Sequence, residues 1–170
     1  YIAACSGLWG APVEAPGGVH RLHDDHAHDV LTAGVVAPND LAFGPDGRLY
    51  FTDPRREEGL TEPIPGGVFA LDVAAGRLEQ LHEGGFFPNG IAFDHTGEFL
   101  YVAETFSGRI VRYPLEAVDR GSLGLRESEV HCETRDGTPD GMAVDAEGNI
   151  WQAVNKSDSV QVFDPNGDYV

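Results

Sequence analysis

PNDLAFGPDGRLYFTD (residues 38–53) recurs twice further along the chain, as PNGIAFDHTGEFLYVAE (88–104) and PDGMAVDAEGNIWQAV (139–154). Each copy opens with a proline followed by asparagine or aspartate. A short apolar run, a turn that ends in glycine and a second apolar run then follow. The opening prolines are 50 and 51 residues apart. A fixed period of this length predicts a repeat architecture in which every unit has the same supersecondary structure.

The segments between the copies also have the composition of β-strands, because they are short, partly apolar and bounded by turn residues. No segment shows the 3.6-residue apolar periodicity of an amphipathic helix. The strands expected outside the copies are YIAAC (1–5), GVHRLH (18–23), DVLTAG (29–34), GGVFALD (66–72), RLEQLHEG (77–84), RIVRYPL (109–115), LRESEVHCE (125–133) and SVQVFD (159–164). The sequence therefore predicts an all-β protein built from units of four antiparallel strands.

Four antiparallel strands that recur every 40–50 residues are typical of a β-propeller, whose blades pack face to face around a central channel. The runs FLYVA and IWQAV are almost continuously apolar, as expected for strands that neighbouring blades cover on both faces. We expect complete or partial blades at 1–36, 37–86, 87–137 and 138–170. The 170 residues amount to about 3.4 blades, whereas propellers close with about four to eight. The chain is then either part of a larger propeller or one of two copies that close as a homo-oligomer.

The chain is strongly acidic, with 28 Asp and Glu residues, 11 Lys and Arg residues and a formal net charge of −17. This charge repels polyanions, which argues against nucleic acid and anionic membranes as partners. No apolar stretch approaches the ~18 residues that a membrane-spanning helix needs. The first residues lack the pattern of a signal peptide. We expect a cytoplasmic protein, with secretion as the alternative because the N-terminus reads as incomplete.

The position after each opening proline carries a side chain with an oxygen atom: Asn39, Asn89 and Asp140. The first strand of a propeller blade lines the channel, so these side chains are expected at the same end of three successive inner strands. Their oxygens suit one hard divalent cation, for which Ca²⁺ is the expected ion and Mg²⁺, Mn²⁺ and Zn²⁺ are alternatives. In the other interpretation, each residue only caps the start of its strand.

The second strand of each blade returns to the same channel mouth, so the residues at its end are further candidates for substrate contacts or for supporting roles. These residues are Asp53, Glu104, Thr105, Asn155 and Lys156. Asp46 belongs to a Pro-Asp-Gly tripeptide at the opposite end of the first strand, where the tripeptide predicts a hairpin turn. Asp140 belongs to a second Pro-Asp-Gly, which the repeat places at the channel mouth.

At these residues the chain resembles the SMP-30/gluconolactonase family, whose members are six-bladed propellers with a divalent metal in the central channel. The resemblance rests on APNDLAFGPDGRLYFTDP, FFPNGIAFDHTGEFLYVAET and TPDGMAVDAEGNIWQAV, which occur in order at blade spacing. It implies that Asn89 and Asp140 are metal ligands and that Asp140 is also the general base. It further implies that Asn39 contacts the substrate or a metal-bound water and that a substrate-binding acidic residue lies near Glu57.

Two features depart from the pattern of the family. Ala37 stands where members of the family have an arginine that binds substrate, which puts sugar-lactone specificity in doubt. The remaining metal ligand of the family is a glutamate in the first blade, and the chain has no obvious counterpart. Glu14, in PVEAP, lies in an expected loop and does not replace it.

The resemblance implies a metal-dependent lactonase whose substrate is a small-molecule lactone or ester. A metal held partly by neutral amide oxygens keeps its Lewis acidity, and Asp140 beside it can accept the proton of an attacking water. The sequence has no G-x-S-x-G motif for a serine nucleophile. The alternative from another class is a non-catalytic propeller, similar to NHL repeats, that binds a ligand or a protein. A third interpretation is another esterase of the same propeller superfamily, similar to strictosidine synthase or to phosphotriesterases.

Overall fold

The computed structural model describes residues 1–4, 17–25, 27–32, 34–35, 37–55, 65–118 and 121–170, and these contain strands but no α-helix. None of the described residues belongs to a helix long and apolar enough to cross a bilayer. The first two sheets comprise β1 (Ile2–Ala4), β2 (Gly18–Leu22) and β3 (His28–Val30), and then β4 (Leu41–Phe43), β5 (Leu49–Asp53), β6 (Pro65–Asp72) and β7 (Arg77–Phe86). The third comprises β8 (Pro88–Phe93), β9 (Phe99–Glu104), β10 (Arg109–Ala117), β11 (Leu123–Leu125) and β12 (Glu129–Glu133), and the fourth β13 (Thr138–Val144), β14 (Ile150–Asn155) and β15 (Ser159–Phe163).

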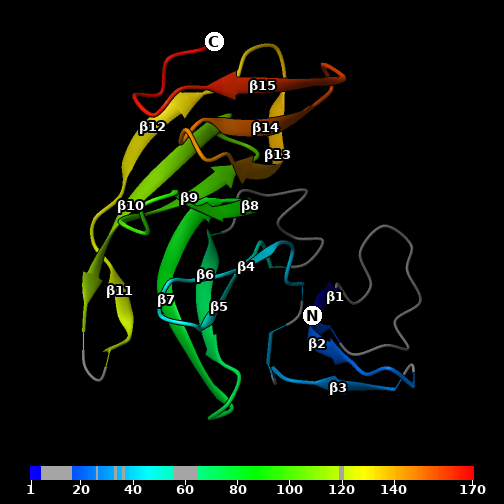
Figure 1. Ribbon diagram of the computed structural model, residues 1–170. Helices are drawn as coiled ribbons and strands as arrows, with labels where there is room; N and C mark the ends of the chain where they lie inside the picture. The colour runs from blue at the N-terminus through cyan, green and yellow to red at the C-terminus, as the bar shows by residue number, and fades with distance from the viewer. Residues whose placement is uncertain (5–16, 26, 33, 36, 56–64, 119–120) are drawn as a thin grey trace.

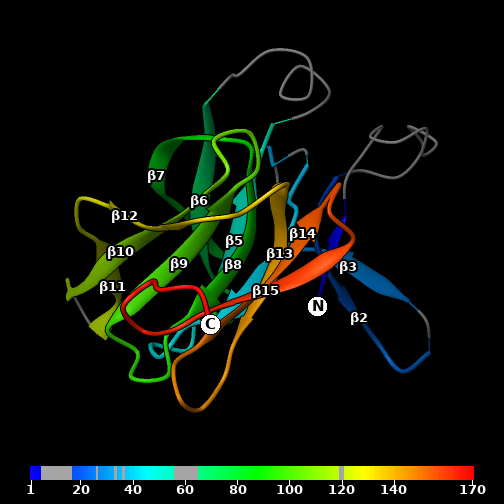
Figure 2. The same ribbon diagram turned by 90° about the horizontal axis from the view of Figure 1, so that it is seen from above.

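The four antiparallel sheets follow one another around an arc, with β4, β8 and β13 on its inner side (Figure 1). The inner strands of consecutive sheets contact one another, since β4 contacts β8 and β8 contacts β13. In both views β2 and β3 project outward from the other sheets (Figure 2). This is the arrangement of blades in a β-propeller, and the predicted all-β propeller fold is confirmed. The blade limits 1–36, 37–86, 87–137 and 138–170 stay the division that we propose.

The outer edge of the third sheet differs from the prediction of one strand over 125–133. β10 is nine residues long, and its two halves have different partners, β12 at its beginning and β11 at its end. Residues 126–128 belong to neither partner strand. β11 is held by the second sheet, because Leu123 donates its N–H to Asp46 at 3.1 Å and its carbonyl accepts a hydrogen bond from Arg48. The single-strand prediction was wrong because this anchor comes from residues distant in the sequence.

The hydrophobic core consists of layers between consecutive sheets. Tyr50 of β5 and Leu100 of β9 belong to the layer between the second and third sheets. Leu49 and Phe51, on the other face of β5, pack against the first sheet. Because successive side chains of a strand point to opposite faces, all five residues of β5 are buried. The same two-sided packing explains the apolar run FLYVA, because the last five residues of β9 are buried; the run IWQAV does not share it.

The fourth sheet is covered on one face only. Residues of β14 alternate between buried and exposed, and Ile150 belongs to the layer shared with the third sheet. On the opposite face, Trp151 is 50% exposed and Val160 on β15 is 60% exposed. No described residue covers this apolar face. The side chains of β14 therefore alternate between buried and exposed, as in a sheet that is covered on one face.

Candidate active site

A β-bulge carries each of the two predicted metal ligands. In β8, Asn89 and Gly90 lie opposite a single residue of β9. In β13, Asp140 and Gly141 lie in the same way opposite a single residue of β14. The extra residue of a bulge bends the strand and redirects its side chain. The motifs Pro-Asn-Gly and Pro-Asp-Gly therefore form equivalent bulges on the inner strands of consecutive sheets.

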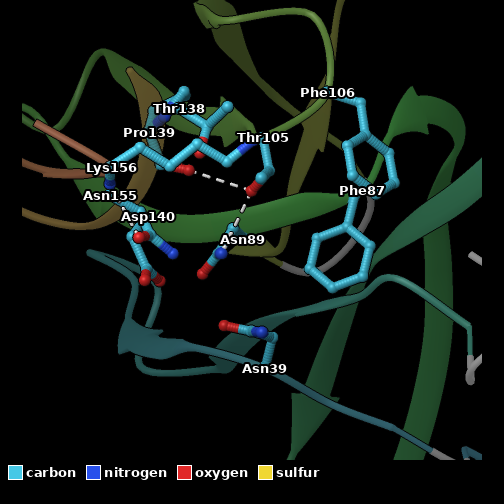
Figure 3. A pocket seen from close by; sticks show the side chains of 10 residues that line it. All are labelled: Asn39, Phe87, Asn89, Thr105, Phe106, Thr138, Pro139, Asp140, Asn155 and Lys156. Atoms are coloured by element: carbon cyan, nitrogen blue, oxygen red, sulfur yellow. Dashed lines mark hydrogen bonds between the residues drawn. The ribbon is translucent and has the colours of Figure 1, made fainter. Parts of the chain in front are cut away.

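Asn39, Asn89 and Asp140 line one pocket, whose volume is about 340 Å³. Asn89 and Asp140 belong to β8 and β13, Asn39 lies just before β4, and Figure 3 shows their side chains around a common space. The other polar residues that line the pocket are Thr105, Thr138, Asn155 and Lys156. The structure thus brings together the three residues that follow the opening prolines. It also adds three of the residues expected from the ends of the second strands.

The side chain of Asn89 is oriented by Thr105. Asn89 is 6% exposed, and its Nδ2 donates a hydrogen bond to the Thr105 hydroxyl at 3.1 Å. Thr105 in turn donates to the carbonyl of Pro139 at 2.9 Å. With its nitrogen engaged in this way, the buried Oδ1 of Asn89 has no hydrogen-bond partner among the described residues. This oxygen is therefore available to a ligand in the pocket.

The carboxylate of Asp140 is exposed and makes no hydrogen bond or salt bridge to another described residue. Its backbone is held by Gln152, a fully buried residue of β14. Nε2 of Gln152 donates to the carbonyls of Asp140 and Gly141, each at 3.1 Å. The buried amide of Gln152 thus provides hydrogen-bond donors for two backbone carbonyls of the bulge. These bonds fix the backbone that carries the Asp140 carboxylate.

Asp40 is an acidic residue beside the site that the sequence interpretation missed, although it is not among the residues that line the pocket. Its carboxylate accepts the N–H of Leu41 at 2.8 Å and, across to the next sheet, the N–H of Ile91 at 3.1 Å. Burial raises the pKa of the Asp40 carboxyl, and the negative charge of Asp140 raises it further, whereas the two N–H groups oppose the rise. The alignment of the repeats considered only the residue after each proline, although the neighbouring acid in Pro-Asn-Asp was visible.

Residues 15–170 match the SMP-30/gluconolactonase/LRE-like region. The chain belongs to this family. The pentonolactonase XacC of Haloferax volcanii is 32% identical over 130 residues, which cover 76% of this chain and 42% of that relative. The gluconolactonase of Zymomonas mobilis is 32% identical over 144 residues, which cover 78% of this chain and 40% of the relative. At the level of the family, these relatives support a hydrolase of the lactonase type.

A solved structure with a similar fold is that of regucalcin from Agrobacterium tumefaciens, described as a calcium-binding protein. Its TM-score to this chain is 0.77 at 25% identity, and the match covers 90% of this chain and 52% of the other. The chain spans about half the length of this protein and less than half of the two curated relatives. The predicted family and fold are thereby confirmed.

The residues of this family member fit a divalent cation. Among the described residues, no three His, Cys, Asp or Glu side chains group as metal ligands. Asn89 and Asp140 instead offer one amide oxygen and one carboxylate. A buried oxygen without a partner costs about 1–3 kcal/mol, and a hard cation that takes oxygen ligands would offset this cost.

The acidic residues predicted to bind substrate lie apart from the pocket or outside the described residues. Asp53 is 5% exposed and accepts the N–H of Arg55 at 2.8 Å. Glu104 is 8% exposed and accepts a hydrogen bond from the Ser107 hydroxyl at 2.7 Å. Neither is among the described residues that line the pocket, and Glu57 lies outside the described residues. Their part in substrate binding stays a prediction.

An aromatic side of the pocket was also missed. Phe87 and Phe106 line the pocket, and their ring centroids are 5.2 Å apart. Phe87 is buried and Phe106 is 46% exposed. The signal in the sequence was the aromatic pair in FFPNG directly before the bulge, to which the sequence interpretation gave no role in the site.

Proposed function

We propose that this protein is a metal-dependent hydrolase that opens a lactone ring with a water molecule in the pocket formed by β8 and β13. One observation carries the proposal: the partnerless Oδ1 of Asn89 and the free carboxylate of Asp140 line the same pocket. A neutral amide oxygen and a single carboxylate leave much of the charge of a divalent cation uncompensated. That residual charge is what Lewis-acid chemistry requires.

Asn89 and Asp140 are the residues that would hold the cation. A divalent cation bound there would polarise the carbonyl of a lactone and lower the pKa of a water molecule. Ca²⁺ is the ion that we propose, because the donors are hard oxygens and because a protein of the same shape is described as calcium-binding. Mg²⁺, Mn²⁺ and Zn²⁺ are the alternatives for the same donors.

Asp140 carries the proton transfer in this proposal. Its carboxylate accepts a proton from the attacking water and returns it to the alkoxide that forms when the ring C–O bond breaks. The reaction consumes one water and produces one hydroxy acid. Gln152 keeps the backbone of Asp140 in place during both transfers, since it hydrogen-bonds two carbonyls of the bulge.

Asn39 orients the substrate in this proposal. It lines the pocket from the segment just before β4, while the two candidate ligands come from the third and fourth sheets. Figure 3 shows its amide facing the ligands across the pocket. An amide at this position can donate to the ring oxygen or a hydroxyl of a lactone and accept from a hydroxyl.

The test compares Asp140→Asn with Glu147→Gln in a lactone-hydrolysis assay on δ-gluconolactone, with and without added Ca²⁺. Glu147 is an exposed residue of the turn between β13 and β14, so its variant removes the same charge away from the pocket. We expect Asp140→Asn to lose at least about a hundredfold in kcat/KM, because it loses its general base. Glu147→Gln should stay within about twofold, since exposed substitutions away from a site have small effects.

Metal binding by calorimetry separates the proposal from its rivals. Weaker Ca²⁺ binding in Asn89→Ala and Asp140→Asn, together with loss of hydrolysis, supports the hydrolase. Ca²⁺ binding without hydrolysis of any lactone or ester identifies a non-catalytic binding propeller instead. Equal hydrolysis by Asp140→Asn and Glu147→Gln would exclude Asp140 as the base.

A further inference from the structure

The pocket has two chemically different sides. Figure 3 shows the rings of Phe87 and Phe106 on one side, and Asn155 and Lys156 next to Asp140 on the other. By the register of strand pairing, Lys156 occupies in the fourth sheet the position that Phe106 has in the third. Equivalent positions around the pocket thus carry an aromatic ring in one sheet and a cation in the next.

Lys156 is the only lysine in a chain with a net charge of −17. Its ammonium group forms no salt bridge with an acid among the described residues, although Asp158 belongs to the same turn. Lys156 is exposed and lines the pocket. A cation at the edge of a pocket, without a salt bridge among the described residues, can attract an anionic ligand.

The backbone at both sides of the pocket supports a role for these side chains. Lys156 has φ = 73° and Phe87 has φ = 59°, so both adopt the left-handed conformation. Non-glycine residues are strained there, and such strain concentrates at functional sites. At Lys156 the turn is held by Asn155, whose Oδ1 accepts the Lys156 N–H at 2.7 Å. Glycine would adopt this φ without strain, so the backbone conformation does not by itself require lysine at this position.

We propose that the pocket selects lactones that carry a carboxylate substituent, with the carboxylate bound by Lys156 and the apolar face of the ring against Phe87 and Phe106. This proposal rests on the proposed function and specifies its substrate class. The charge of the whole protein repels anions, but at physiological salt this repulsion is screened beyond about 8 Å. A direct ion pair between Lys156 and the substrate acts within that distance.

A carboxylate fits the site better than a phosphate. Lys156 provides one positive charge as a compact point charge, which matches a monoanion. Asp140 contributes negative charge to the same pocket, and this charge disfavours a dianionic group. Phosphate sites typically combine several N–H donors or an arginine fork, and among the described residues that line the pocket there is no arginine.

The first experiment measures the binding of 5-oxotetrahydrofuran-2-carboxylate and of its uncharged carboxamide to the full chain by calorimetry. Each ligand is tested with Ca²⁺ and after chelation, which separates Lys156 from direct attraction to the metal. We expect the carboxylate to bind about tenfold tighter than the carboxamide, as charge-assisted hydrogen bonds do. Lys156→Met should abolish this preference, whereas Phe106→Ala should weaken both ligands equally. Equal losses for both ligands in Lys156→Met, or no loss for either, would overturn the proposal.

The second experiment uses the fact that one lysine is present. Reductive methylation with isotopically labelled formaldehyde keeps the charge of Lys156 and gives one dimethyl-lysine NMR signal, with the α-amino signal as internal control. The carboxylate should shift the lysine signal and the carboxamide should not. A shift of the lysine signal by neither ligand, or equally by both, contradicts the assignment. This readout needs no turnover, so it stays informative if no lactone is hydrolysed.

A stability control separates recognition from a structural role. Lys156→Gly relieves the left-handed strain, so its thermal midpoint should equal or exceed that of the wild type. The same variant should lose the preference for the carboxylate. A fall in the midpoint with the ligand preference intact would assign Lys156 to the fold and overturn the proposal.

Discussion

The amide nitrogen of Asn89 donates to the hydroxyl of Thr105 at 3.1 Å, and this contact leaves the oxygen of the same amide without a partner at the pocket. Thr105 follows the last residue of β9, and its hydroxyl also reaches the carbonyl of Pro139 in the next sheet. One hydroxyl thus orients a candidate ligand and joins two consecutive inner strands. The orientation of Asn89 therefore depends on a residue that does not itself ligate.

Thr105→Val removes this orientation while it keeps the shape of the side chain. The amide of Asn89 can then rotate, and we expect Ca²⁺ affinity to fall about tenfold, which is the usual effect of losing a residue that positions a metal ligand. Calorimetric titration of the purified chain measures the affinity. Thr105→Ser retains the hydroxyl and should bind Ca²⁺ like the wild type. An unchanged affinity in the valine variant would show that Thr105 does not position Asn89.

Gly90→Ala should disturb the contact between the third and fourth sheets. A Cβ at Gly90 would lie 2.4 Å from the carbonyl oxygen of Asp140 and 2.9 Å from the backbone nitrogen of Met142. Backbone atoms cannot move aside cheaply, so we expect a loss of about 1–3 kcal/mol in the free energy of unfolding. Urea denaturation measures this loss, and Ca²⁺ affinity should fall with it because the two bulges are forced apart.

Gly141→Ala is the matched control, since Gly141 has the same place in the next bulge. A Cβ there would meet no atom within 4 Å. We expect stability within about 0.5 kcal/mol of the wild type, as for other substitutions that make no new contact. Equal free energies of unfolding for the two alanine variants would show that the close backbone contact at Gly90 does not destabilise the alanine variant.

The repeat in the sequence was sufficient to predict the fold and the placement of Asn39, Asn89 and Asp140. Both depend on local patterns, because the strands follow from short apolar runs bounded by turn residues and the three positions follow from Pro-Asn or Pro-Asp at a fixed spacing. The repeat also placed Thr105, Asn155 and Lys156 near the same end. Position within a repeat therefore carried more information than any single motif.

Contacts between sheets account for what was not predicted. The break between β11 and β12 depends on Asp46 and Arg48 of the preceding sheet. The raised pKa of Asp40 depends on its burial against the third sheet, where its carboxylate accepts the N–H of Ile91. The aromatic side of the pocket includes Phe87, whose backbone adopts the left-handed conformation. Each feature arises from residues far apart in the chain or from a rare conformation, which strand patterns do not report.

Asp46→Ala and Glu79→Ala test a buried and an exposed partner of the same arginine. Arg48 donates to Asp46 at 2.7 Å and to Glu79 at 2.9 Å. The side chain of Asp46 is 2% exposed and that of Glu79 is 53% exposed. Removing the buried partner should cost about 3 kcal/mol or more, whereas removing the exposed one should cost less than about 1 kcal/mol. Urea denaturation of both variants provides the comparison, and equal losses would contradict it.

The same carboxylate predicts a specific dependence of stability on pH. Burial alone would raise the pKa of Asp46, but hydrogen bonds from Arg48, Tyr50 and Leu123 outweigh it and hold the pKa below its usual value. The unfolded chain therefore binds a proton at Asp46 at a higher pH, about 3.9, than the folded chain does. The contribution of Asp46 is then complete above about pH 4 and is lost as the pH falls through the lowered folded value.

Asp46→Asn isolates this effect, since the amide cannot titrate. The variant should be less stable than the wild type at neutral pH, because it loses the ion pair with Arg48. The difference in the free energy of unfolding between the two proteins should shrink as the pH falls below about 4, where the unfolded Asp46 is protonated. Urea denaturation at a series of pH values measures the difference directly. A difference that stays constant from neutral pH to well below pH 4 would show that Asp46 is not charged in the folded protein or that its pKa is not lowered.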